Sequence, residues 1–186
     1  MTLRPVIFSG PMVAGLLAGR KTQTRRLATS PLARCQPSDR LYVREAFCWW
    51  TDPPELEGEA WPPAGCVRAP DSADGAVDPD RMFVAHREGW DGPAPSGGWR
   101  PSIHMPRWAA RVVLRVTEVR HQRLREITPA DADAEGVRQL WTGSCRPGFG
   151  DLWAALHDKP GTRWEDDPDV VALTFAVRAP NERDRL

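Results

Sequence analysis

The chain has 186 residues, of which 41% are apolar and 27% are charged, as is ordinary for one globular domain with its own core. The 25 basic residues equal the 25 acidic ones, which argues against a protein that coats long nucleic acid through its net charge. No apolar run approaches the roughly 20 residues of a membrane span, and the N-terminus lacks a signal-peptide pattern. We therefore expect a single cytoplasmic domain over 1–186 that has no membrane partner.

Cysteine and histidine spacing gives no indication of a metal centre. The four cysteines contain no CxxC pair, and the four histidines have no second ligand at i+3 or i+4. The cysteines are Cys35, Cys48, Cys66 and Cys145, and we expect buried or idle thiols. The sequence therefore predicts a protein without a metal ion or other cofactor.

The first fifty residues alternate between strand and helix patterns. PVIF at 5–8 predicts a short strand, and the apolar spacing after Ser9-Gly10-Pro11 predicts a helix over about 11–18 that ends at Gly19. A basic segment at 20–26 follows it directly. Alternation in RLYVREAF then indicates a second strand.

Residues 51–106 are dense in Pro, Gly and Asp, which predicts a long irregular insertion with one strand near 82–85. Strands are predicted at 111–119 and from 169 onward, because both segments are rich in β-branched residues. Between them, Thr128-Pro129 starts a short helix that ends at Gly136, and a second helix covers about 148–158. This order predicts a mostly antiparallel barrel or an α+β domain.

The basic segment at 20–26 is the first candidate site. A desolvated lysine beside arginines can take a hydroxyl proton near neutral pH, so Lys21 and Thr24 could form a base and nucleophile pair. The alternative is a basic turn that only keeps the surface soluble. Glu135, in the last turn of the predicted helix, could orient the lysine or accept a hydrogen bond from a cytosine amine.

The insertion is rich in tryptophan and is followed by a basic stretch at 107–125. Single-stranded RNA or DNA could stack on such rings, or the rings could instead anchor the Pro-rich segment to the rest of the domain. The tryptophans in or beside the insertion are Trp49, Trp50, Trp61, Trp90, Trp99 and Trp108. Their residue types alone leave both interpretations open.

Several separated segments resemble the ASCH domain and follow one another in the order of that family. They are LLAGRKTQTRR, PSDRLYVRE, RVVLRVTEV, ITPADADAEGV and DVVALTFAV. SGPMV, PSIHMPRWAAR and WEDDPDV further resemble a larger subgroup that is found in phages and prophages. The resemblance implies an α+β, PUA-like fold, in which a mixed β-barrel is flanked by short helices and carries the insertion at about 51–106.

One small bacterial branch of the ASCH family hydrolyses N4-acetylcytidine with a lysine, a threonine and a glutamate, which fall on Lys21, Thr24 and Glu135. The resemblance implies that Thr24 attacks the amide carbonyl, Lys21 is its general base, and Glu135 binds the base and passes a proton to the leaving amine. The residues expected to bind substrate beside them are Arg20, Thr22, Arg25, Arg26, Arg107 and Trp108.

The expected function is thus a metal-independent amidohydrolase for N4-acylated cytosine nucleosides or related modified nucleobases. The alternative is a ribonuclease, or a non-catalytic module that binds RNA, DNA or modified bases. This chain is longer than the minimal amidohydrolases, and its insertion could cover the site or add a nucleic-acid surface.

Overall fold

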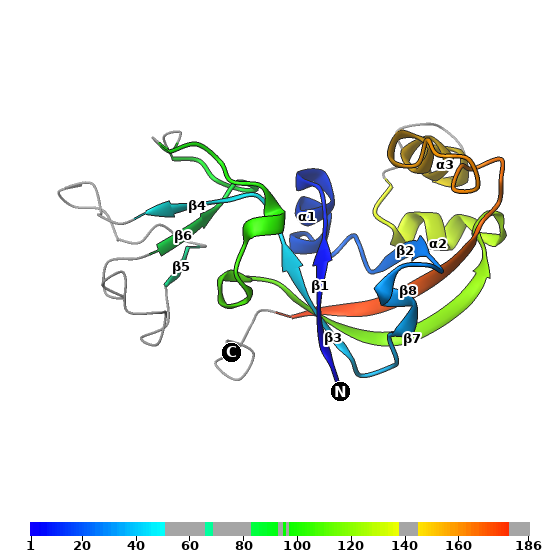
Figure 1. Ribbon diagram of the computed structural model, residues 1–186, viewed down its shortest axis with the longest axis horizontal. Coiled ribbons are helices and arrows are strands. Elements are labelled where there is room, and N and C mark those ends of the chain that lie inside the picture. The colour runs from blue at the N-terminus through cyan, green and yellow to red at the C-terminus, as the bar shows by residue number, and fades with distance from the viewer. Residues whose placement is uncertain (51–65, 69–82, 93–94, 96, 138–144, 179–186) are drawn as a thin grey trace. The chain divides into compact units, whose positions relative to one another are not determined.

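The computed structural model describes the chain except for 51–65, 69–82, 93–94, 96, 138–144 and 179–186 (Figure 1). The α-helices are α1 (Gly10–Leu17), α2 (Pro129–Ala134) and α3 (Cys145–Leu156). The strands are β1 (Leu3–Ile7), β2 (Gln23–Leu27), β3 (Arg40–Arg44), β4 (Phe47–Trp50), β5 (Val67–Arg68), β6 (Phe83–His86), β7 (Val113–Arg123) and β8 (Asp169–Arg178). Short 3-10 helices cover Pro31–Arg34, Ser102–His104, Arg107–Ala109 and Leu124–Glu126.

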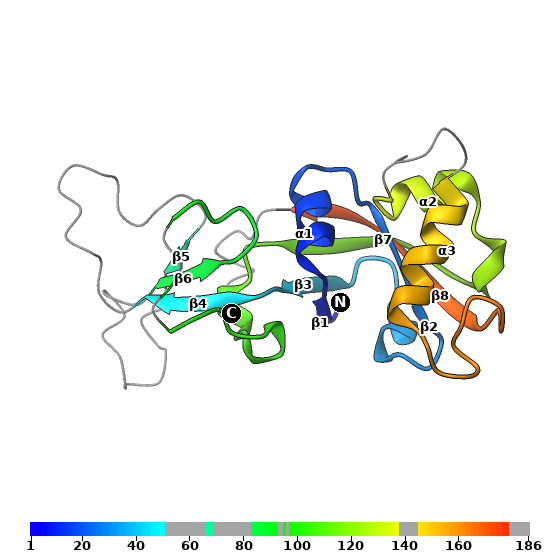
Figure 2. The same cartoon turned by 90° about the horizontal axis from the view of Figure 1, so that it is seen from above.

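The strands form two sheets. Five strands follow the order β1-β3-β7-β8-β2, and three follow the order β4-β6-β5 (Figure 2). The larger sheet begins at β1 and ends at β2, so the strands that the structure describes do not form the closed barrel expected from the resemblance. The α+β class is confirmed, because the helices and strands of one chain contribute to the same core.

The described residues divide into two compact units. The first comprises Met1–Arg4, Gly15–Leu41 and Leu114–Arg178, and the second comprises Pro5–Ala14 and the described part of 42–113. Each unit contains its own cluster of buried apolar side chains. The single domain expected over 1–186 stays a prediction.

The core of the first unit lies between α2, α3 and one face of the β2–β8 pair (Figures 1 and 2). It consists of Leu124, Ile127, Ala132, Phe149, Trp153 and Val170, with Leu27, Val137 and Trp164 packed against them. The buried Trp153 ring also donates its indole N–H to Thr162 O at 2.8 Å, so its polar atom is satisfied. This packing attaches both helices to the end of β2.

The second unit packs around Phe47, and four of its tryptophans contact other rings. Trp49 lies edge-on to Phe47 with centroids 5.3 Å apart, and Trp108 lies 5.5 Å from Trp49. Trp90 and Trp99 form another edge-on pair. These contacts favour the interpretation in which the rings anchor irregular segments to the rest of the domain. Trp61 lies outside the described residues.

Three strands of the structure, β2, β4 and β5, were not predicted from the sequence. The segment at 20–26, expected as a basic turn or junction, contains β2, which pairs antiparallel with β8 from Gln23 opposite Thr174 to Leu27 opposite Val170. It was missed because its inward side chains are polar, so it lacks the alternation of apolar residues that marks a strand. β4 and β5 were also not predicted, while the strand near 82–85 is confirmed as β6.

The N-terminus of α2 has the cap that its sequence predicts. Thr128 Oγ1 accepts a hydrogen bond from Asp131 N at 3.1 Å, and Asp131 Oδ2 accepts one from Thr128 N at 3.2 Å. Pro129 occupies the first helical position, where its missing N–H costs nothing. Because α2 has six residues, this reciprocal cap is a large share of its local stabilisation.

We expect Thr128→Ala to lower the free energy of unfolding by about 1 kcal/mol, because it removes the side-chain acceptor of the cap. Thr128→Ser keeps the hydroxyl and should stay within about 0.5 kcal/mol of the wild type. Urea denaturation followed by circular dichroism measures both. Equal losses for the two variants would contradict the role of the cap.

Candidate functional site

Lys21 is placed by a tight turn between α1 and β2. Gly19 has a φ of +69° and donates to Leu16 O, which ends the helix as predicted. The Lys21 side chain then runs between two glycines, since a Cβ added to Gly15 or Gly136 would lie 3.4 or 3.1 Å from Lys21 Cβ. With 1% of its surface exposed, Lys21 is among the largest of the fully buried side chains described.

The Lys21 ammonium is surrounded by three oxygen acceptors. Its Nζ lies 2.8 Å from Glu135 Oε2, 2.9 Å from Glu135 O and 2.9 Å from Gln23 O. An ammonium has three N–H donors, so these acceptors match its hydrogen-bonding capacity. Glu135 is the C-cap residue of α2 and is itself buried, so this ion pair is almost out of water.

Arg25 is a second buried cation on the same carboxylate. Its Nη1 lies 3.1 Å from Glu135 Oε1 and donates to Gln23 Oε1 at 2.6 Å, while its Nη2 lies 3.2 Å from Asp131 Oδ2. Glu135 therefore holds Lys21 with one oxygen and Arg25 with the other. Asp131 precedes Glu135 by four residues, which places both carboxylates on one side of α2.

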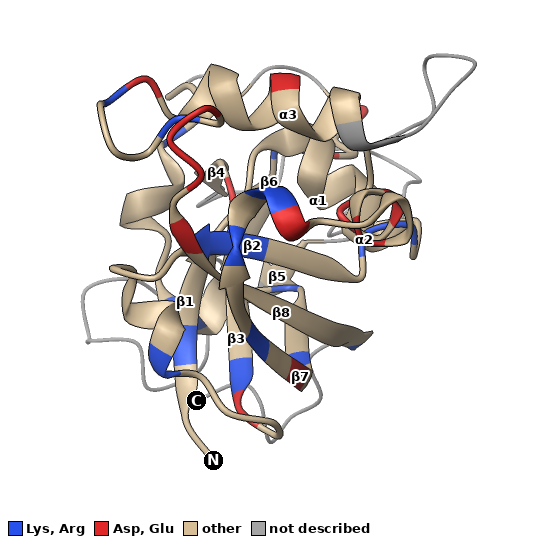
Figure 3. Cartoon of the chain, turned by 90° about the vertical axis from the view of Figure 1, so that its right-hand side faces the viewer, with Lys and Arg blue, Asp and Glu red and all other residues tan. Residues whose placement is uncertain are grey.

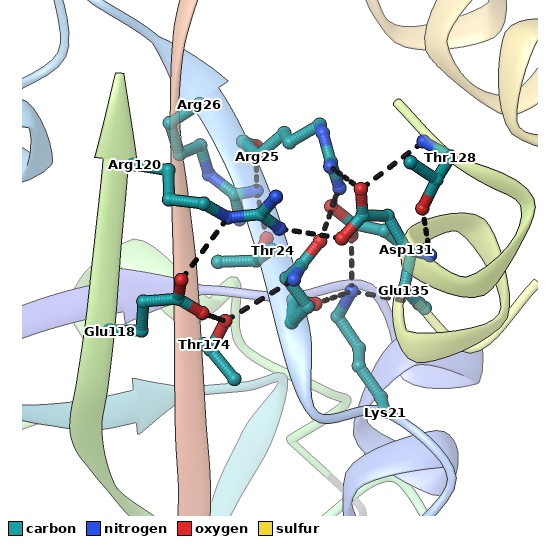
Figure 4. A network of polar contacts seen from close by, with 11 residues as sticks. Lys21, Thr24, Arg25, Arg26, Glu118, Arg120, Thr128, Asp131, Glu135 and Thr174 are labelled. Carbon is teal, nitrogen blue, oxygen red and sulfur yellow. Dashed lines mark hydrogen bonds and ion pairs between the residues drawn. The ribbon is translucent and has the colours of Figure 1, made fainter. Parts of the chain in front are cut away.

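These contacts continue to the surface and return, as Figure 4 shows. Asp131 Oδ1 accepts from Arg120 Nη2 at 2.5 Å, and Arg120 Nε lies 3.6 Å from Glu118 Oε1. Thr174 Oγ1 donates to Glu118 Oε2 at 3.1 Å and accepts from Gln23 Nε2 at 3.2 Å. We call this closed set the polar ring; it consists of Lys21, Gln23, Arg25, Glu118, Arg120, Asp131, Glu135 and Thr174.

The polar ring shifts the ionisation of two of its members. Burial lowers the pKa of the Lys21 ammonium below its usual value, although Glu135 opposes this, and the nearby Arg26 and Arg25 lower it further. Burial alone would raise the pKa of Asp131, but hydrogen bonds from Arg120 and Thr128 outweigh it and hold that pKa below its usual range. Burial thus weakens the hold of Lys21 on its proton, and hydrogen bonds favour an ionised Asp131.

Thr24 lies on the other face of β2. Successive strand residues point to opposite faces, and the partners of Gln23 and Arg25 lie on the α2 side. The buried Thr24 Oγ1 instead accepts from Arg26 Nη1 at 2.7 Å, and the same Nη1 donates to Arg25 O at 2.8 Å. A cationic donor therefore already lies on the hydroxyl that the resemblance implies as nucleophile.

The structure brings together some of the expected site residues. Lys21 and Glu135 form an ion pair, and Arg25, expected to bind substrate, contacts both carboxylates of α2. Arg20 is exposed, and Thr22 donates its backbone N–H to Ala134 O. Arg107 and Trp108 belong to the second unit, where Arg107 is exposed and Trp108 packs against Trp49. The catalytic and binding roles stay predictions.

Sequence reasoning missed five members of the polar ring, namely Gln23, Glu118, Arg120, Asp131 and Thr174. Asp131 was expected only as part of the short helix that starts at Thr128-Pro129, and Arg120 only as part of a basic stretch. One signal was present, because Asp131 and Glu135 have the four-residue spacing of a shared helix side. The remaining members are brought together by strand pairing, which the pattern of β2 does not reveal.

The basic stretch at 107–125 is largely neutralised. Of its six arginines, four contact acidic side chains: Arg111 contacts Glu45, Arg120 contacts Asp131 and Glu118, and Arg123 and Arg125 contact Asp167. Figure 3 shows acidic as well as basic segments on β7. The stretch is therefore a weaker attractor of phosphate than its sequence suggests.

Metal-binding groups and membrane-spanning helices can be assessed for the described part of the chain. There, no three side chains of His, Cys, Asp or Glu gather in a way that could hold a metal ion. No helix in the same part combines the length and apolar character needed to cross a bilayer.

Two solved structures are similar to this chain. An ASCH domain from Lactobacillus crispatus JV V101 is 10% identical, with 95% of this chain and 79% of that chain covered and a TM-score of 0.45. A protein from Enterococcus faecalis V583, described as DUF984, is 10% identical, with 98% and 83% covered and a TM-score of 0.46. The first carries the family name that the sequence motifs resemble. At these TM-scores, neither structure supports the transfer of an activity to this chain.

No protein-family model matches the chain, and no curated protein matches its sequence.

Because Glu135 contacts both Lys21 and Arg25, we expect its substitution to cost more unfolding free energy than substitution of Lys21. Glu135→Gln leaves two buried cations without their shared anion and should cost about 3–5 kcal/mol of unfolding free energy. Lys21→Met leaves the Arg25–Glu135 pair intact and should cost less than about 2 kcal/mol. Chemical denaturation measures both, with the exposed Lys159→Met as a control expected to change nothing. A simple Lys21–Glu135 pair would instead give similar losses.

The glycine contact with Lys21 can be tested in a matched pair. Gly136→Ala and Gly19→Ala both force an L residue into positive φ, at about 1–2 kcal/mol each. Only Gly136 also has Lys21 Cβ within contact distance, whereas a Cβ on Gly19 meets nothing within 4 Å. We expect Gly136→Ala to lower the melting temperature further than Gly19→Ala. Equal decreases would show that the Lys21 side chain does not depend on the absence of a Cβ at residue 136.

Proposed function

We propose that this chain is an ASCH-type amidohydrolase that removes the acyl group from N4-acylated cytosine nucleosides or related modified nucleobases. The observation that carries this proposal is the buried Lys21–Glu135 pair. The two residues are 114 positions apart, and the motif resemblance pairs them in one site. Their side-chain atoms lie 2.8 Å apart, with 1% and 4% of the side chains exposed.

The chemistry depends on the one cationic side chain in the polar ring that can give up its proton and then act as a base. Of the 25 lysines and arginines, only Lys21 and Lys159 are lysines. Arginine keeps its proton in proteins, so Arg25 and Arg120 cannot take a proton from a nucleophile. Burial lowers the pKa of Lys21, and a neutral Lys21 amine is a competent acceptor.

Thr24 is the proposed nucleophile, and Arg26 is its partner. The Arg26 guanidinium donates to Thr24 Oγ1 at 2.7 Å, so it would stabilise negative charge that develops on that oxygen. Thr24 and the Lys21–Glu135 pair lie on opposite faces of β2. In the proposed proton transfer from Thr24 to Lys21, bridging water carries the proton between the two side chains.

The proposed cycle returns every proton. Neutral Lys21 takes the Thr24 hydroxyl proton as Oγ1 bonds to the acyl carbon. The bond from that carbon to N4 then breaks, and the leaving amine receives the proton of Lys21 by way of Glu135. In the second half, Lys21 takes a proton from the attacking water, the ester bond to Thr24 breaks, and Thr24 Oγ1 recovers that proton. The products are the cytosine nucleoside and the carboxylic acid.

The rival function, binding of single-stranded RNA or DNA, has less support. It was motivated by the basic stretch and by the tryptophan-rich insertion. Four of six arginines in that stretch contact acidic groups, and Trp49 and Trp108 pack on each other. Both observations reduce the free charge and ring surface for a nucleic-acid strand.

The proposal predicts that purified protein hydrolyses N4-acetylcytidine or a bulkier N4-acyl analogue, with release of cytidine measured by chromatography. Thr24→Val and Lys21→Met should each lower kcat at least about 100-fold, because each removes a group that takes part in proton transfer or bond formation. Thr117→Val, an exposed threonine on β7, is the matched control and should retain full turnover.

A well-folded wild type that leaves the whole acylcytidine panel intact would rule out this activity. Titration with single-stranded RNA and DNA across salt concentrations would then test the rival, for which affinity should decrease steeply as salt increases.

A further inference from the structure

Lys21 belongs to a set of charges that balances without it. Around it, Glu135 and Asp131 carry two negative charges, and Arg25 and Arg120 carry two positive charges that contact them directly. Arg26, which acts on Lys21, and Glu118, which contacts Arg120, add one charge of each sign. The Lys21 ammonium is therefore the surplus cation of the cluster.

We propose that Arg25, Asp131 and Arg120 are positioning residues for Lys21: together they balance the charge of Glu135, so that Lys21 can lose its proton without leaving an unpaired buried carboxylate. This inference rests on the proposed function, in which Lys21 is the base. It assigns a role to three residues that the motif resemblance does not include in the catalytic set.

Of the two cations that contact Glu135, only Lys21 can lose its proton near neutral pH. Glu135 Oε1 contacts Arg25, whose side chain is fully buried and keeps its proton at any working pH. Glu135 Oε2 contacts Lys21, whose amine can be neutral. When Lys21 is neutral, Glu135 still has a cationic partner. A buried Lys–Glu pair alone would lack this, because loss of the lysine proton would leave the carboxylate uncompensated.

Arg120 is the accessible end of this arrangement. Its side chain is 36% exposed, whereas that of Asp131 is 10% exposed and that of Arg25 is fully buried. Neutralising Arg120 makes the surroundings of Lys21 more negative, which favours the ammonium. Neutralising Asp131 makes them more positive, which favours the amine. Substitutions at two residues in direct contact should thus act in opposite directions on Lys21.

The test is direct, because the chain has two lysines. In protein labelled with ¹³C-lysine, the ε-carbons give two signals, which Lys21→Met assigns, and the exposed Lys159 serves as an internal reference. We expect Lys21 to titrate at lower pH than Lys159. Arg120→Gln should raise its midpoint by about half a pH unit or more, and Asp131→Asn should lower it by a similar amount.

Two controls separate charge from structure. Arg115→Gln removes one positive charge from an exposed position on the same strand and should leave the Lys21 midpoint unchanged. The double variant Arg120→Gln with Asp131→Asn restores the balance and should return the midpoint to the wild-type value. A merely structural role would move both single variants in the same direction, since each loses the same hydrogen bond.

Shifts in the same direction, no shift, or a Lys21 that titrates with Lys159 would each overturn the inference. The readout needs no turnover, so it fails independently of the proposed function. If the protein also hydrolyses acylcytidines, activity is lost as pH falls below the pKa of the base. Because Arg120→Gln raises the midpoint of Lys21, the acidic limb of the pH profile should then move to higher pH. If the Lys21 midpoint shifts as expected but no acylcytidine is hydrolysed, the inferred charge balance stands and the proposed activity is rejected.

Discussion

The Glu135 carboxylate, held between Lys21 and Arg25, is the contact on which the first unit depends. Glu135 caps the C-terminus of α2, and both cations come from β2 or the turn before it. A buried carboxylate without cations costs several kcal/mol, so the two contacts fix where α2 ends against the strand. The position of α2 in turn places Ala132 in the core that it shares with α3.

An ion pair at such a position is poorly explained by stability alone. Apolar side chains of similar volume often stabilise a core as well as a buried pair does. Here the pair is embedded in a ring that also includes Asp131 and Arg120, and the ring extends from a fully buried lysine to a partly exposed arginine. Extensive polar burial with most partners satisfied is typical of sites where charge does chemical work.

Sequence reasoning found the elements whose inward faces are apolar or whose ends are capped. The helix start at Thr128-Pro129 and the final strand were both predicted, because a cap or a β-branched run marks each. β2 was missed since three consecutive buried residues, Gln23, Thr24 and Arg25, are polar. The Lys21–Glu135 pair came from the motif resemblance, as no local pattern connects residues so far apart.

Lys21 and Arg26 also bond the outer edge of β2. β2 is the last strand of its sheet, and Thr22 O and Ala28 N bond to β8, so the carbonyls of Gln23 and Arg25 point outward by alternation. Lys21 Nζ covers the first and Arg26 Nη1 covers the second. Exposed edge carbonyls are templates for pairing with another chain. Lys21 and Arg26 therefore also occupy the two edge carbonyls with which another strand would pair.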